Sequence, residues 1–214
     1  IMLNERYKNK LISLDEAVGM IKSNDLVVIA PGSAEPLEIL DRLPSIADKV
    51  ENVTISTMLS MRLHDIYKDP KYNGIFNIES AFYSAPLRLA NKFGISTFMP
   101  SHLRNVGPAL SKQKSNILYT MVAPMDKHGY FSMGCCGCID QYDVLSNVDK
   151  VVALVNPQMP RTFGDTLIHI NDIDYICDIN RPVLTLPDAV ITEDDMKIGK
   201  YISELIDDGS TIQL

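Results

Sequence analysis

The sequence predicts an α/β domain built on an open, mainly parallel sheet with helices on both faces. Short apolar runs of strand length alternate with segments of helical periodicity along the whole chain. The strongest runs, residues 26–30 and 151–155, are apolar without alternation, which is typical of strands buried on both faces. The 214 residues suffice for one well-buried core, and they contain no fixed repeat or low-complexity linker. We therefore expect a single domain over residues 1–214.

The first half of the chain alternates helix and strand signals. After a short helix over residues 3–10, Ser13 and Glu16 have the spacing of a capping box, which predicts the start of a second helix. The turn 31–36 leads from the buried strand into a helix over about residues 36–50, with a bend at Pro44. Further strands are expected at residues 53–58, 75–82 and 95–100, and further helices within 59–73, over 86–93 up to Gly94, and over 101–110 with a disturbance at Gly107-Pro108.

The middle of the chain is the stretch around which the rest is organised. We expect strands over residues 117–122 and 151–155, a helix over residues 139–148 and a polar loop over residues 156–164. Pro124 lacks the N–H that a sheet ladder needs and Gly129 tolerates positive φ, so the first of these strands must stop and turn. The polar loop leaves the carboxyl end of the second strand, where open α/β sheets bind ligands.

The last part of the chain gives weaker signals. Residues 167–179 mix short apolar pieces without a clear division into elements. The proline-bounded segment 181–187 is typical of an edge or linking segment. Thr192 and the acidic residues after it predict the start of a helix, and residues 210–214 predict the beginning of a strand. The apolar residues of that helix are Met196, Ile198, Ile202, Leu205 and Ile206.

The composition argues against several classes of function. The formal net charge is −7 and the basic residues are scattered, which disfavours a nucleic-acid surface. No apolar run approaches a membrane span, and the first residues lack the features of a signal peptide, so we expect a cytoplasmic protein without a membrane partner. Three of the four cysteines crowd at Cys135, Cys136 and Cys138, which is not the pattern of a disulfide framework.

The turn after the first buried strand is one candidate site. Gly32 and Ser33 lie where a strand leads into a helix, a geometry that points backbone N–H groups at an anion. The turn has neither the glycine pattern of a dinucleotide site nor a Walker lysine, which excludes both of these nucleotide sites. A phosphate-bearing or carboxylate ligand remains open.

His128 and the cysteine cluster are the other candidates. His128 lies beside Asp126 and Gly129 and could act as an acid or base, although a plain turn role is more common and no nucleophile of triad type is evident. Cys135 and Cys138 form one C-x-x-C, but no second pair completes a zinc site, and packing of small residues is favoured over a redox role. Spacing alone therefore identifies no catalytic residue and no metal site.

Two motifs resemble segments of the acetyl-CoA hydrolase/transferase family. Residues 122–134, V-A-P-M-D-K-H-G-Y-F-S-M-G, resemble its V-S-P-x-D-x-H-G-Y-x-S-x-G segment. Residues 155–165, V-N-P-Q-M-P-R-T-F-G-D, are similar to its V-N-x-x-M-P-x-x-x-G-D segment. The turn 31–36 and residues 208–214 also fit, so the resemblance covers essentially the whole chain. It is greatest to the branch of 4-hydroxybutyrate and butyryl-CoA:acetate CoA-transferases.

The resemblance implies an enzyme of two similar α/β domains with the active site in the cleft between them. In that family a glutamate attacks the acyl-CoA, and an enzyme-bound glutamyl-CoA thioester passes CoA to a short carboxylic acid. The glutamate and the glycine-rich CoA loop belong to the second domain, so no catalytic residue is carried over to this chain. We expect the amino-terminal domain, inactive alone, with coenzyme A as substrate and no tightly bound cofactor.

The resemblance places Gly32, Ser33 and Gln213 at the substrate, with Asp126, His128 and Gly129 in a possible cleft loop. The expected partners are an acyl-CoA, a short-chain carboxylate and the protein's own carboxy-terminal domain, and a homo-oligomer is possible. Pro31 stands where relatives of the 4-hydroxybutyrate type carry histidine, so the acyl acceptor stays open. The alternatives are an acyl-CoA hydrolase of the same family and a stand-alone small-anion-binding or regulatory module.

Overall fold

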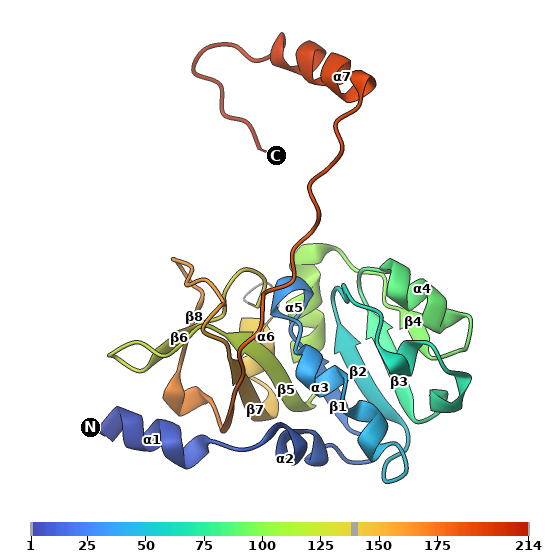
Figure 1. Cartoon of the computed structure of the whole chain (residues 1–214), viewed down its shortest axis with the longest axis vertical. Helices are drawn as coiled ribbons and strands as arrows, with labels where there is room; N and C mark the ends of the chain where they lie inside the picture. The colour runs from blue at the N-terminus through green and yellow to red at the C-terminus, as the bar shows by residue number, and fades with distance from the viewer. Residues whose placement is uncertain (1, 138–140, 214) are drawn as a thin grey trace. The chain divides into compact units, whose positions relative to one another are not determined.

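The computed structural model describes residues 2–137 and 141–213, and this part of the chain divides after Leu184 into two compact units. The first unit contains the sheet of the α/β fold (Figure 1), and the second contains one helix. The division falls inside residues 181–187, the segment predicted to be an edge or a link, and no strand is assigned to it.

The first unit is organised around a seven-stranded sheet in which the neighbouring strands pair in parallel. The strand order is β4-β3-β2-β1-β5-β7-β9. The strands are β1 (Leu26–Ile29), β2 (Val53–Thr57), β3 (Phe76–Ser80), β4 (Ser96–Phe98), β5 (Ser115–Val122), β7 (Val148–Val155) and β9 (Tyr175–Asp178). The predicted fold class is confirmed.

The strand order reverses between β1 and β5. From β1 the chain builds outward through β2, β3 and β4, and it then returns to place β5 on the other side of β1. The loops that follow β1 and β5 therefore leave the sheet on the two sides of this point. In open α/β sheets such a switch point is where ligands bind, at the carboxyl ends of the strands.

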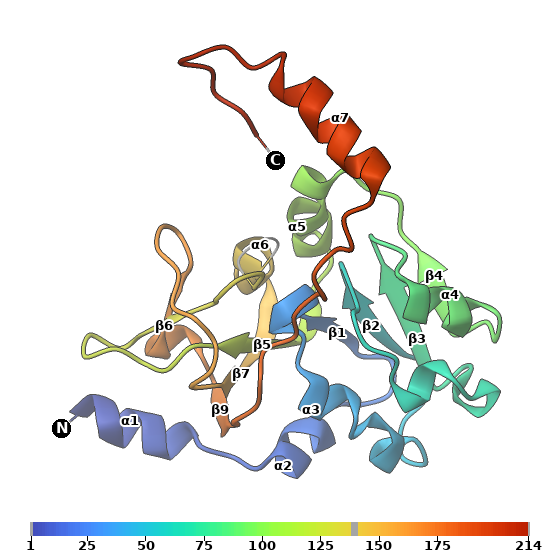
Figure 2. The same ribbon diagram turned by 45° about the horizontal axis from the view of Figure 1, so that its top comes forward.

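Helices cover both faces of the sheet, as the sequence predicted (Figure 2). They are α1 (Met2–Lys10), α2 (Leu14–Gly19), α3 (Leu37–Leu40), α4 (Ala85–Asn91), α5 (Leu103–Ser111) and α6 (Gln141–Leu145), with 3-10 turns η1 (Gly32–Ala34), η2 (Leu43–Ile46), η3 (Asp65–Tyr67), η4 (Pro70–Tyr72) and η5 (Ile170–Asp172). Along β5, Tyr119 packs in the core cluster of α2, α3 and α4, while Leu118 packs in that of α5 and α6. This alternation is what a strand covered on both faces requires.

Two predicted helices are wrong in their extent because prolines interrupt them. The helix expected over residues 36–50 is split into α3 and η2, since the Pro44 ring conflicts with a helical carbonyl at Leu40 and offers no N–H. The helix expected within residues 59–73 is replaced by η3 and η4, because Pro70 holds Asp69 in an extended conformation. By contrast, α5 continues through Pro108 and loses one backbone hydrogen bond there.

The connection after β5 contains structure that the sequence pattern did not indicate. Strand β6 (Tyr130–Ser132) pairs antiparallel with β8 (Leu167–His169) in a separate two-stranded sheet. The helix expected over residues 139–148 ends at Leu145, because Val148 already pairs with Ser115 as the first residue of β7. The predicted start of that helix at Ile139 lies outside the described residues.

The second unit holds α7 (Glu193–Ser203), whose start was predicted. Thr192 accepts the N–H of Asp195, and the Asp195 carboxylate accepts the N–H of Thr192, so a capping box forms. The strand expected over residues 210–214 is wrong for residues 210–213, which have no strand partner, and Leu214 lies outside the described residues. None of the described helices combines the length and apolar character that a bilayer span requires.

Candidate functional site

The loops that follow β1, β2 and β3 are joined at the carboxyl edge of the sheet. The N–H of Gly32, after β1, donates to the carbonyl of Leu59, after β2, over 2.8 Å. The N–H of Phe82, after β3, donates to the carbonyl of Met58 over 2.9 Å. Three consecutive strand ends therefore carry one continuous, hydrogen-bonded rim beside the switch point.

Gly32 and Ser33, both predicted to contact substrate, lie in this rim. Gly32 adopts φ +59°, and a Cβ there would lie 3.2 Å from the Cys136 Sγ. The Ser33 hydroxyl donates to the same sulfur over 3.3 Å. The turn after β1 thus meets the loop after β6 and leaves little room for a side chain at Gly32. Packing of small residues, which the sequence favours for this C-x-x-C over a redox role, stays a prediction, because Cys138 lies outside the described residues.

Glu35, which the sequence analysis did not single out, holds the Gly32 turn in place by hydrogen bonds. Its side chain is fully buried and accepts the Ser60 hydroxyl at 2.5 Å and the Met61 N–H at 3.2 Å. Its own N–H donates to the carbonyl of Gly32. Burial raises the pKa of Glu35 to about 7, although the hydrogen bonds from Ser60 and Met61 act to lower it. One carboxyl group therefore joins two loops of the rim and titrates near neutral pH.

A histidine lies beside this carboxyl group. The Nδ1 atom of buried His64 lies 2.9 Å from the Asp41 carboxylate, which can only accept, so Nδ1 carries the proton. Its Nε2 lies 3.9 Å from Glu35 Oε1 and has no hydrogen-bond partner among the described residues. Burial lowers the pKa of His64, which favours the neutral ring. No motif marks Glu35 or His64, because their burial arises only from the way the loops fold over the strand ends.

The predicted cleft loop is a tight turn between β5 and β6. The Asp126 carboxylate accepts the N–H groups of His128 at 2.8 Å and Tyr130 at 2.9 Å. It also accepts the Arg161 guanidinium at 2.7 Å. Partial burial acts to raise the pKa of Asp126, but these hydrogen bonds and the Arg161 charge hold it below its ordinary value. Gly129 has φ +89°, and a Cβ there would lie 2.9 Å from the Nε2 atom of His169.

Asp126 and Arg161 also join the two sequence motifs, and a second set of contacts does the same. The Ser132 hydroxyl oxygen accepts the N–H groups of Gly134 and Thr162, at 3.2 and 3.0 Å. The Thr162 hydroxyl donates to the carbonyl of Gly134 over 3.1 Å. A Cβ on Gly134 would lie 2.2 Å from the sulfur of Met159, which is buried. The motifs therefore form one packed body at the ends of β5 and β7.

These contacts predict a structural role for Asp126 and none for the His128 ring. The Asp126→Ala variant should lower the free energy of unfolding by about 1 kcal/mol, because two backbone donors and a partly exposed guanidinium lose their acceptor. The His128→Ala variant should change it by less than about 0.5 kcal/mol, because the described contact uses only the backbone. Urea unfolding followed by circular dichroism measures both. Equal losses would contradict this assignment.

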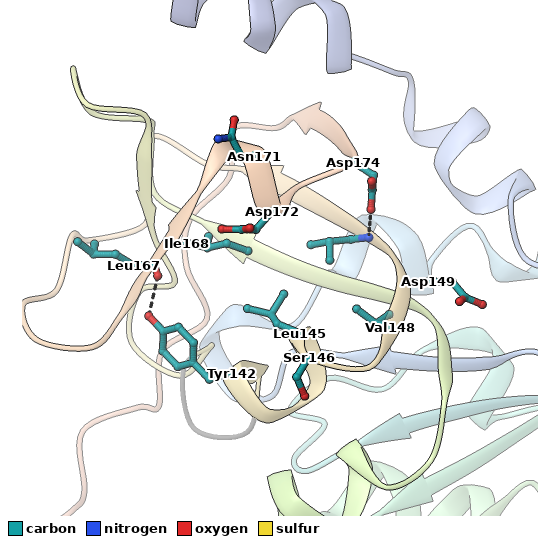
Figure 3. A pocket seen from close by; sticks show the side chains of 11 residues that line it. Tyr142, Leu145, Ser146, Val148, Asp149, Leu167, Ile168, Asn171, Asp172 and Asp174 are labelled. Atoms are coloured by element: carbon teal, nitrogen blue, oxygen red, sulfur yellow. Dashed lines mark hydrogen bonds between the residues drawn. The ribbon is translucent and has the colours of Figure 1, made fainter.

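Two cavities differ in position and chemistry. The first, of about 380 Å³, opens at the carboxyl ends of β2 and β3 and is lined by Met58, Leu59, Ala81, Phe82, Ser101, Leu103 and Val106. The second, of about 530 Å³, lies beside α6 and the amino end of β7, away from the switch point (Figure 3). There Asp174 accepts the N–H of Val151 and Tyr142 donates to the carbonyl of Leu167, so these groups hold the local fold.

Among the described residues no cluster of His, Cys, Asp and Glu could hold a metal ion.

The chain matches known proteins over nearly its whole length. The sequence profile of the acetyl-CoA hydrolase/transferase N-terminal domain matches residues 2–187. The chain is 32% identical over 214 residues to succinyl-CoA:cyclohexane-1-carboxylate CoA transferase of Geobacter metallireducens, covering 98% of this chain and 48% of that protein. It is 31% identical over 213 residues to 4-hydroxybutyrate coenzyme A transferase of Clostridium kluyveri, covering 98% and 49%.

The crystal structure of RipA from Yersinia pestis has a similar fold, with a TM-score of 0.90 and 23% identity over 98% of this chain and 51% of that chain. The chain spans about half the length of the curated relatives it matches. The profile match covers nearly all of the first unit, including both motifs that bring Asp126 and Arg161 together. The chain belongs to the acetyl-CoA hydrolase/transferase family, whose N-terminal domain it contains.

Proposed function

We propose that this chain is the amino-terminal domain of a carboxylate CoA-transferase, which moves CoA from an acyl-CoA to a short carboxylic acid. The observation that carries the proposal is that the two relatives above, aligned over 98% of the chain, are both named CoA transferases. The geometry supports it, because the family motifs and the Gly32 turn lie at the loop edge beside the switch point, where an α/β sheet binds ligands.

In this proposal the chain supplies one wall of the active-site cleft. The turn at Gly32 and Ser33 faces the substrate, Glu35 fixes its position, and the turn at Asp126 forms a further loop of the cleft. Gln213 is a further substrate contact in this proposal, and the catalytic glutamate lies in the second domain. Coenzyme A enters as a substrate, with no tightly bound cofactor.

The names of the relatives favour transfer over hydrolysis. In this family a transferase and a hydrolase both use the attack of the glutamate on the acyl-CoA. They differ in the acceptor, which is a carboxylic acid in the transferase and water in the hydrolase. Both named relatives transfer CoA to or from a carboxylic acid of four or more carbons. We propose butyryl-, 4-hydroxybutyryl- or acetyl-CoA with a short carboxylate as the substrate pair.

The proposal is tested with the complete reading frame that contains these residues. The complete protein should form acetyl-CoA from butyryl-CoA and acetate, and release of free CoA should be slower than transfer. The 214-residue chain alone should show neither activity. Chromatography of the CoA thioesters follows all of these products. Release of free CoA at the same rate with and without acetate would contradict transfer and favour the hydrolase.

A further inference from the structure

The apolar cavity of about 380 Å³ has a preformed floor. The N–H of Phe82 donates to the carbonyl of Met58, and the Ser80 hydroxyl lies 3.3 Å from that carbonyl and 2.9 Å from the carbonyl of Phe82. The loops at the ends of β2 and β3 are therefore tied together through residues that line the cavity. Met58 and Val106, on its inner side, are buried in the core cluster shared with α5. The cavity volume is that of a small-molecule site.

The lining indicates what the cavity can hold. Among the described residues that line it none is charged, and the one side-chain hydroxyl, that of Ser101, is hydrogen-bonded to the neighbouring His102 carbonyl. Such a lining gives an ionised carboxylate or phosphate no partner, whereas it removes an alkyl group from water at a gain. Phe82 and Leu103, both 62% exposed, leave apolar surface at the mouth.

The cavity adjoins the turn that the proposed function assigns to the substrate. Leu59 lines the cavity, and its carbonyl accepts the Gly32 N–H at 2.8 Å. Leu59 therefore belongs both to the lining of the cavity and to the hydrogen bond that holds the Gly32 turn. Resting on the proposed function, we propose that this cavity receives the alkyl part of the acyl group, and that Ala81 and Val106 set the acyl length the protein accepts.

Methyl NMR on the 214-residue chain tests binding without any catalysis. With 13C-methyl methionine labelling, millimolar cyclohexanecarboxylate should shift the Met58 signal saturably, while the buried Met121 and Met133 signals stay in place. Acetate should shift none of them, because its single methyl group offers too little apolar surface to bury. The Ala81→Leu variant should weaken the shift by roughly tenfold, since the new side chain fills the cavity. The Ala85→Leu variant, at an exposed position outside the lining, should not. No saturable Met58 shift would overturn the proposal.

Acyl selectivity of the complete protein provides a second test of the proposed acyl cavity. The Ala81→Leu variant should lower the ratio of kcat/KM for butyryl-CoA to that for acetyl-CoA by roughly tenfold. The Val106→Ala variant should raise kcat/KM for acyl groups larger than butyryl, relative to that for acetyl-CoA. A ratio cancels any loss of folded protein. Unchanged ratios in an active enzyme would overturn the acyl cavity and leave the transferase standing. A Met58 shift without CoA transfer would overturn the transferase instead.

Discussion

As the pH rises from about 5 to about 8, the unfolding free energy of the wild-type chain is expected to fall by about 3 kcal/mol more than that of a Glu35→Gln variant. The Glu35 pKa is raised to about 7 in the folded protein by burial. Between its ordinary pKa and that value, the folded chain binds more protons at this site than the unfolded chain, so stability falls as the pH rises. Each unit of pKa difference corresponds to about 1.4 kcal/mol. The glutamine of the variant carries an amide that imitates the protonated acid and does not titrate.

Urea unfolding at a series of pH values measures this difference. Burial lowers the pKa of His64, so its contribution rises with pH in both proteins and largely cancels in the comparison. The exposed Glu5 supplies the control, because Glu5→Gln removes the same charge without burial. A wild-type curve parallel to that of Glu35→Gln through neutral pH would show that Glu35 is ionised throughout, and the link between the two loops would then be a buried carboxylate.

The Gly134→Ala variant is expected to lose about 3 kcal/mol of unfolding free energy. Gly134 has φ +66°, a conformation that costs an L-residue about 1 kcal/mol or more. Its new Cβ would also lie 2.2 Å from the Met159 sulfur, and forcing a buried side chain aside costs about 1–3 kcal/mol. The matched control is Gly164→Ala, since Gly164 has φ +87° and no atom within 4 Å of its Cβ position.

The control should therefore lose only the backbone part, about 1 kcal/mol. Chemical denaturation of both variants under one condition separates the two effects. Equal losses would mean that Met159 moves aside without cost, and the two family motifs would then pack more loosely than their contacts indicate. The larger loss for Gly134→Ala would identify the close approach of the motifs as the reason for glycine at that position.

Much of the fold could be predicted because the relevant signals are local. The central strands are continuous apolar runs, and the starts of α2 and α7 carry capping boxes that need only four residues. What could not be predicted depends on distant partners. Strands β6 and β8 have three residues each and pair across more than thirty positions, and Val148 follows helical spacing yet pairs with β5. Such pairings compete with local propensity and leave no periodic pattern.

In the candidate site, too, the sequence identifies residues in motifs but not the contacts that depend on distant partners. The motif residues Asp126 and Arg161 are visible in the sequence, but the ion pair between them forms only when β5 and β7 are neighbours. Glu35 was visible only as part of a turn, since a glutamate before proline gives no sign of complete burial. Gln213 belongs to the second unit, so its place in the cleft stays a prediction.

The central claim is that this chain forms one wall of a cleft that needs a second domain to bind substrate. Calorimetric titration of acetyl-CoA into the 214-residue chain, beside the complete protein, tests that claim most directly. We predict saturable heat with the complete protein and none with the chain alone at micromolar concentrations, because the proposed function assigns the CoA loop and the catalytic glutamate to the second domain. Micromolar binding by the chain alone would contradict the claim and favour a self-contained ligand-binding module.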